Sequence, residues 1–83
     1  MWYAMNYENG IIAEAKTKKE VLSKISDIDT RCKRTGKGSY VYEQQDEEER
    51  SCWHEIAYIY SSEKMAIANG FGWAFKKALA EMQ

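Results

Sequence analysis

The stretch Gly10–Ile28 constrains the fold more than any other, because it combines a hairpin turn, a strand and a capped helix. The turn is Asn9-Gly10, a pair that suits a type I′ turn because both of its central residues need φ > 0. The segments on either side alternate, and a two-residue loop pairs Tyr7 with Ile12 and Met5 with Glu14. The sequence therefore predicts a β-hairpin at the start of the chain.

Alternation gives this hairpin one bulky face and one small face. The bulky face carries Tyr3, Met5, Tyr7 and Ile12, and the other face carries Trp2, Ala4, Ile11, Ala13 and Ala15. The pattern leaves open which face forms the core, and the small side chains favour the alanine-rich face for close packing against a helix.

A long basic helix is predicted to follow. Thr17 and Glu20 form a capping box, in which each side chain accepts the backbone N–H of the other residue. An apolar stripe continues from there through Val21, Leu22, Ile25, Ile28 and Cys32. Arg31, Lys33 and Arg34 then lie in the last turn, where cations complement the helix dipole, and Gly36 is the natural stop.

The second half of the chain predicts two strands and a helix. Ser39–Gln44 alternates like a short strand, and Cys52–Tyr60 is apolar on both sides, which is typical of a central strand. Ser61 or Ser62 caps the final helix, whose wide apolar arc runs from Met65 to Met82. Gly70 and Gly72 indicate a kink or a close contact within it.

These elements give the order ββαββα. We therefore expect one α+β domain over residues 1–83, with two layers: an antiparallel sheet and two helices on one of its faces. A chain of this length has a small core, which a homodimer would enlarge. No apolar run approaches the roughly 20 residues of a membrane span, and two cysteines do not indicate a disulfide framework. These features predict a cytoplasmic protein without a membrane partner.

Charge is unevenly distributed along the chain. Residues 16–37 hold eight basic and three acidic side chains, a local net charge of +5 in a chain of net charge −1. The rest carries −6, concentrated in Asp46, Glu47, Glu48 and Glu49. Such separation indicates two electrostatically different surfaces, although solvated helix and loop residues give the same pattern.

No catalytic motif is present, and we expect a protein that is not an enzyme and needs no cofactor. The one cluster that resembles a site is Cys52-Trp53-His54-Glu55. On a strand, Cys52 and His54 lie about 7 Å apart, too far for a nucleophile–base hydrogen bond. A zinc site would require Cys32 as well, and the chain has no second histidine. The sequence therefore predicts no catalytic residue and no metal ligand.

Surplus aromatic residues beside charged segments favour a binding protein, because protein interfaces are enriched in exposed Tyr and Trp. The leading hypothesis is a small protein that occupies the surface of a protein or nucleoprotein partner, as an inhibitor or adaptor. The predicted contact residues are Lys18, Lys19, Arg31, Lys33, Arg34 and Lys37 in the basic region, Asp46, Glu47, Glu48 and Glu49 in the acidic loop, and the exposed aromatics Tyr40 and Tyr42.

The alternative hypothesis is a single-stranded nucleic-acid-binding protein, in which the same basic residues track phosphates and sheet aromatics stack on bases. The slightly acidic balance of the chain is atypical of such proteins. No family motif decides between the two hypotheses. In size and composition alone, the chain is similar to small accessory proteins of phages and mobile elements, including anti-CRISPR-type inhibitors, and this likeness assigns no site residue.

Overall fold

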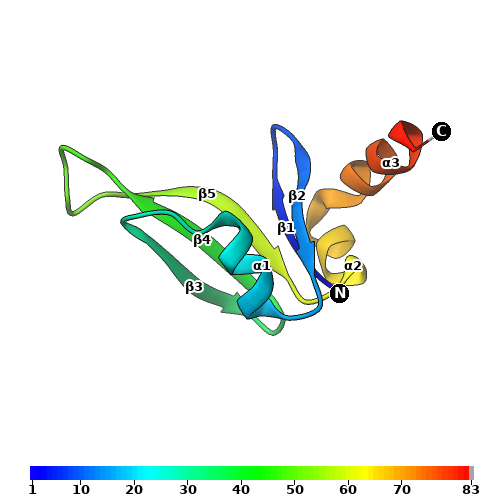
Figure 1. Ribbon diagram of the computed structural model, residues 1–83, viewed down its shortest axis with the longest axis horizontal. Coiled ribbons are helices and arrows are strands. Elements are labelled where there is room, and N and C mark those ends of the chain that lie inside the picture. Colours follow the sequence, from blue (N-terminus) through cyan, green and yellow to red (C-terminus); the bar gives the residue numbers. More distant parts are fainter. Residues whose placement is uncertain (83) are drawn as a thin grey trace.

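Five antiparallel strands form one sheet, in the order β2-β1-β5-β4-β3, in the computed structural model, which describes residues 1–82 (Figure 1). The strands are β1 (Trp2–Asn6), β2 (Gly10–Ala15), β3 (Thr30–Gly36), β4 (Ser39–Gln45) and β5 (Trp53–Tyr60). Helix α1 (Lys18–Ile25) joins β2 to β3, and β5 is followed by α2 (Glu63–Ala66), the wide turn η1 (Ile67–Phe71) and α3 (Gly72–Glu81). The α+β class is confirmed. The predicted order ββαββα is wrong, because β3 is an additional strand.

Helix α1 begins where the capping box predicts and ends earlier than expected. The Thr17 hydroxyl accepts the N–H of Glu20, but the helix stops at Ile25. The following turn satisfies its own backbone, since Asp27 accepts the N–H of Ile28 and the Thr30 hydroxyl donates to the Asp27 carbonyl. Such local hydrogen bonds compete with helix continuation. Residues 30–36 pair with β4 instead, and Ile28, counted in the predicted apolar stripe, is exposed.

The first hairpin also differs from its prediction. Its loop has three residues, Tyr7 to Asn9, and the Asn6 side chain accepts the N–H of Asn9 at 2.7 Å. Met5 therefore pairs with Ile11, and an irregularity follows before Ala4 pairs with Ala13. Because of this bulge, Ile11 lies on the bulky face and Ile12 on the alanine-rich face, opposite to the expectation.

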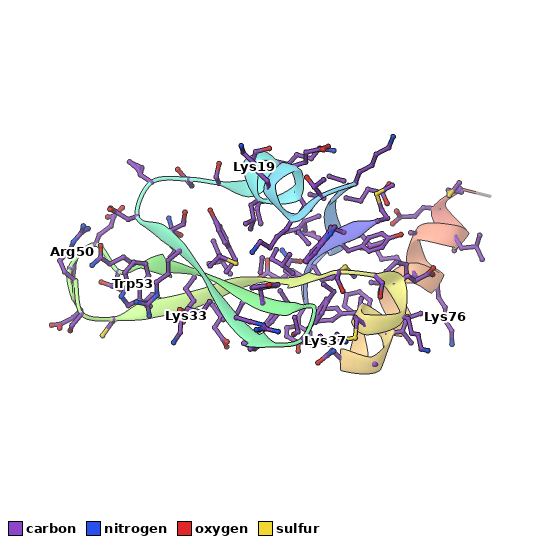
Figure 2. All side chains as sticks on the ribbon, turned by 90° about the horizontal axis from the view of Figure 1, so that it is seen from below. Lys19, Lys33, Lys37, Arg50, Trp53 and Lys76 are labelled. Carbon is purple, nitrogen blue, oxygen red and sulfur yellow. The ribbon has the colours of Figure 1, made fainter. Side chains whose placement is uncertain are left out.

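Strand β5 is central, as predicted, and both faces of its second half, from Ala57 to Tyr60, are covered. Ala57 and Ile59 belong to one core cluster with Ala4, Ala15 and Val21 of α1. Tyr60 belongs to a second cluster on the other face, with Met5 and with Ala66, Phe71 and Ala74 of the C-terminal helices. The expected placement of both helices on one face is therefore wrong. Figure 2 shows α1 above the sheet and α2 below it.

The predicted kink in the last helix is confirmed. Ser62 caps α2 by accepting the N–H of Met65, and helical dihedral angles are interrupted at Asn69 and at Gly70, which has φ +93°. A Cβ at Gly70 would touch nothing within 4 Å, so this glycine serves the bend and not a close contact. The bend leaves Phe71 fully buried, with its ring centre 4.9 Å from that of Tyr7 and 5.8 Å from those of Tyr58 and Tyr60.

Beyond the helices, β3, β4 and the first half of β5 continue as an arm that makes the molecule 43 Å long and 24 by 21 Å across (Figure 1). In residues 1–82 no helix is long and apolar enough to cross a membrane.

The sequence predicts a close contact at Gly70 or Gly72 as the alternative to a kink, but a close contact with α3 occurs at Gly10 of β2. There, a Cβ would lie 3.1 Å from the Cβ of Ala74, and φ is +84°.

We expect Gly10→Ala to lower the free energy of unfolding more than Gly70→Ala does. Both substitutions force a left-handed residue, at a cost of about 1–2 kcal/mol, and only the first also pushes α3 away from the sheet. Gly36→Ala is the control, because its backbone is ordinary and its Cβ meets nothing within 4 Å. Urea unfolding of the three variants checks this, and equal losses at Gly10 and Gly70 would contradict the packing of α3 on β2.

Candidate binding surfaces

The basic residues from the middle of the chain lie on a strand and not at the end of a helix. Arg31, Lys33 and Arg34 belong to β3, the last strand of the sheet order, and Lys37 lies in the turn to β4. All four are exposed. The helical residues Lys18 and Lys19 are on α1, above the sheet, whereas Lys33 lies on the lower side of the arm (Figure 2). The predicted basic surface is thus divided between two faces of the molecule.

Arg31 is held by its neighbours. Its guanidinium lies 4.0 Å from the centre of the Trp53 ring, and its Nε donates to Oε1 of Glu43 at 3.0 Å. The Glu43 side chain is only 12% exposed, so this ion pair is partly shielded from solvent. Lys33 lies on the same face of the arm and has no such carboxylate partner within residues 1–82 (Figure 2). Lys33 is therefore the freer of the two cations.

The two predicted surface tyrosines are packed under α1. Tyr42 is 5% exposed, and its hydroxyl is 2.6 Å from that of Thr30, so the expectation of an exposed ring is wrong. Tyr40 is half-buried, next to Trp2, with the Lys18 ammonium 4.3 Å from its ring centre. Both rings lie on the sheet face that α1 covers, because every second residue of β4 points toward that helix.

The acidic loop at the end of the arm is an organised turn. The Asp46 carboxylate accepts hydrogen bonds from the backbone N–H groups of Glu48 and Glu49 and from His54 Nε2, each at 2.9 Å. These hydrogen bonds, that of the Glu49 N–H first, lower the pKa of Asp46 from its ordinary value of 3.8 to about 2. Asp46 therefore holds the loop together, and Glu47, Glu48 and Glu49 project into solvent.

A second set of contacts ties this loop to the turn after α1. Both terminal nitrogens of Arg50 donate to the Asp29 carboxylate, at 3.2 and 3.3 Å, and the Gln45 side chain donates to the Arg50 carbonyl. The Gln45 N–H donates to the Asp29 carbonyl at 2.8 Å. The tip of the arm thus has a defined shape although its side chains are exposed.

The residues of the Cys52-Trp53-His54-Glu55 cluster lie at the start of β5 and immediately before it, and Cys52 is outside the strand. His54 is hydrogen-bonded to Asp46, and Cys52 is exposed. Cys32 is half-buried on the side of α1, and this burial raises the pKa of its thiol. No group of three or more His, Cys, Asp or Glu side chains within residues 1–82 is placed to hold a metal ion.

One surface was missed by the sequence analysis: an apolar groove on the outer side of α2 and α3. Its volume is about 560 Å³, and Glu63 and Lys76 lie among the residues that line it. The apolar lining includes Ile67, Leu79 and Met82, which are 48%, 59% and 84% exposed. The signal was the width of the apolar arc, because the positions that face the sheet, such as Phe71 and Ala74, use only part of it.

A smaller hollow of about 340 Å³ lies between the first hairpin loop and β5, and it is more polar than the groove. Tyr58 lines this hollow, and its hydroxyl donates a hydrogen bond to Oε1 of Glu55 at 3.3 Å.

Comparisons with protein families, with curated proteins and with solved structures found no match to this chain.

We expect the acidic loop to keep its structure down to unusually low pH. Because the folded pKa of Asp46 is depressed, its stabilising contribution is complete above the ordinary value of 3.8 and is lost as the pH falls through about 2. NMR titration of the Asp46 side-chain carbon, and of the Glu48 and Glu49 amides, measures this midpoint. Asp46→Asn is the control and should abolish the transition, whereas a midpoint near 4 in the parent protein would contradict the hydrogen bonds described.

Proposed function

We propose that the protein acts by binding: it occupies the surface of a macromolecular partner, as an inhibitor or an adaptor, and converts no substrate. The observation that carries this proposal is the apolar groove on α2 and α3. Exposed apolar surface that is contiguous and rimmed by polar residues is typical of protein-interaction sites. Here Ile67, Leu79 and Met82 form it, with Glu63 and Lys76 beside them.

The most exposed side chains of the groove, those of Ile67, Leu79 and Met82, belong to neither core cluster. The C-terminal helices already bury Ala66, Phe71 and Ala74 against the sheet, and these side chains are at most 2% exposed. A surface helix normally presents polar residues on its opposite face. An apolar outer face lowers solubility without contributing to the core, and contact with a partner accounts for it. A protein partner, alone or in a nucleoprotein complex, fits this surface.

The charged surfaces support the same proposal. The loop between β4 and β5, which carries the exposed Glu47, Glu48 and Glu49, lies at one end of the molecule, and α2 and α3, whose residues line the groove, lie toward the other end (Figure 1). Electrostatically distinct patches select partners and orient them during encounter. An inhibitor of the kind found in phages and mobile elements would use such surfaces, and so would a homodimer that buries the groove.

We expect Leu79→Glu to abolish partner binding. A charge in the groove must be desolvated when the partner docks, whereas the 59% exposed side chain contributes little to folding. Ala80→Glu is the matched control, since it adds the same charge to an exposed position of α3 outside the groove. A photoreactive amino acid at position 79, compared with position 20 on α1, identifies the cross-linked partner in cells of the native host.

The molar mass from light scattering distinguishes a homodimer, in which a second copy covers the groove, from binding of a different protein. A dimer in the parent protein that becomes a monomer in Leu79→Glu assigns the groove to a homodimer. A monomer that cross-links one protein from position 79 only supports a hetero-partner. If position 79 cross-links no more than position 20 and the protein is monomeric, the proposal is wrong about the groove.

The alternative function, single-stranded nucleic-acid binding, is favoured by one observation: the Arg31 guanidinium stacks on Trp53, and Lys33 lies on the same face. Glu43 and Glu55, which pair across β4 and β5 beside them, oppose phosphate binding there. Fluorescence anisotropy with random single-stranded RNA and DNA, at low and physiological salt, decides the matter. We expect no salt-dependent binding.

The nucleic-acid alternative makes the opposite forecast for the same measurement. Affinity would fall with salt by about 0.7 log units per log unit of salt for each phosphate neutralised. Lys33→Glu would weaken binding, whereas Lys76→Glu, on the opposite end of the molecule, would not (Figure 2). Micromolar binding with that pattern would replace the protein-partner proposal.

A further inference from the structure

The two outer strands of the sheet are protected to different degrees. On β2, the Lys24 ammonium donates to the Glu14 carbonyl at 2.7 Å, and Gly10 lies against Ala74 of α3. The Lys77 ammonium donates to the carbonyl of Asn9, just before this strand, at 3.3 Å. β3 is the other outer strand and has seven residues. Within residues 1–82, neither a strand nor a side chain is hydrogen-bonded to the outer backbone of its first five residues. The open edge of this sheet is therefore that of β3.

The register shows which backbone groups of β3 face outward. In an antiparallel pair, the residues alternate between hydrogen bonding to the neighbouring strand and pointing away from it. The Gln45 N–H donates to the Asp29 carbonyl, and in the same phase Arg31 pairs with Glu43 and Lys33 with Val41. The N–H and C=O groups of Thr30, Cys32 and Arg34 consequently point away from β4. They form a template for one more strand.

The charge of this edge determines what can pair with it. Lys33 projects on the side away from α1, beside Arg31, whose guanidinium is already paired with Glu43, and Arg34 pairs with Tyr40 on the side of α1. Cations therefore border both faces of the edge. A second copy that paired β3 with β3 would bring these cations against one another, which is destabilising. An extended segment rich in Asp or Glu meets complementary charge instead.

We propose that β3 binds an extended acidic segment of a protein partner, which adds to the sheet as a sixth strand. Main-chain hydrogen bonds supply affinity in this mode of recognition, and side chains supply selectivity. The inference deepens the function proposed above and rests on it, but it uses a surface different from the α2–α3 groove. The two therefore fail independently.

The test uses the complete protein and a fluorescein-labelled peptide of seven alternating glutamate and valine residues. The control peptide has the same sequence with every backbone nitrogen methylated. Methylation keeps the charge of the peptide and removes the N–H groups that strand pairing requires. We expect the unmodified peptide to bind at least tenfold more tightly. On its addition, the amides of Cys32 and Arg34 should exchange with solvent at least tenfold more slowly. The Arg31 and Lys33 amides, already bonded to β4, should change little.

A matched pair of variants locates the binding edge. Arg34→Gln and Arg34→Pro remove the same charge, but only the proline also removes an outward N–H, and proline is tolerated at such edge positions. We expect R34P to bind the unmodified peptide at least tenfold more weakly than R34Q. Circular dichroism shows whether both variants fold, and if R34P does not, the two peptides on the parent protein still decide.

Three outcomes would overturn the inference: equal binding of the two peptides, which would mean electrostatic attraction alone, equal binding by the two folded variants, or no peptide binding at all. A partner cross-linked at position 79 together with any of these results would retain the proposed function and remove the strand addition. Peptide binding without a partner cross-linked at position 79 would retain the strand addition and remove the groove as a binding site.

Discussion

Burial of both faces of the second half of β5 is the constraint on which the rest of the structure depends. Ala57 and Ile59 point to one side of this strand, and Tyr58 and Tyr60 point to the other. Neither set can be left in water without losing the main driving force for folding. One helix must therefore lie on each face, and the connections place α1 on the first and the C-terminal helices on the second (Figure 2). The deep burial of Tyr60 also raises the pKa of its hydroxyl to about 12.

Short helices can cover only part of a sheet whose strands continue past them. Helix α1 has eight residues, and the kink at Gly70 turns α3 toward β2. The lower side of the arm is left without a helix, and there Arg31 lies on Trp53 and pairs with Glu43. The tip of the arm is held by the hydrogen bonds of Asp46 and Arg50. The surfaces available for binding thus follow from the incomplete cover of one sheet.

These surfaces combine three kinds of recognition on a small chain. The α2–α3 groove offers apolar contact, the β3 edge offers main-chain hydrogen bonds among cations, and the tip offers carboxylates. Affinity in protein complexes generally comes from a few desolvated apolar contacts, whereas peripheral charges mainly set encounter rate and specificity. That division assigns the groove the larger share of binding energy, and the charged surfaces the choice of partner.

The sequence by itself determined the elements whose signals are local: the Thr17 cap, the central strand β5, the kink at Gly70 and the α+β class. Residues 30–36 could not be assigned locally, because Ile28 and Cys32 continue a helical spacing, whereas the backbone of residues 30–36 pairs with β4. The two faces of the first hairpin depend on a bulge that the loop length sets. Only the tertiary structure decided that the helices lie on opposite faces, that Tyr42 is buried, and that the outer side of α3 stays uncovered. Each of these depends on which residues distant in sequence exclude water together, and that is a property of the assembled sheet.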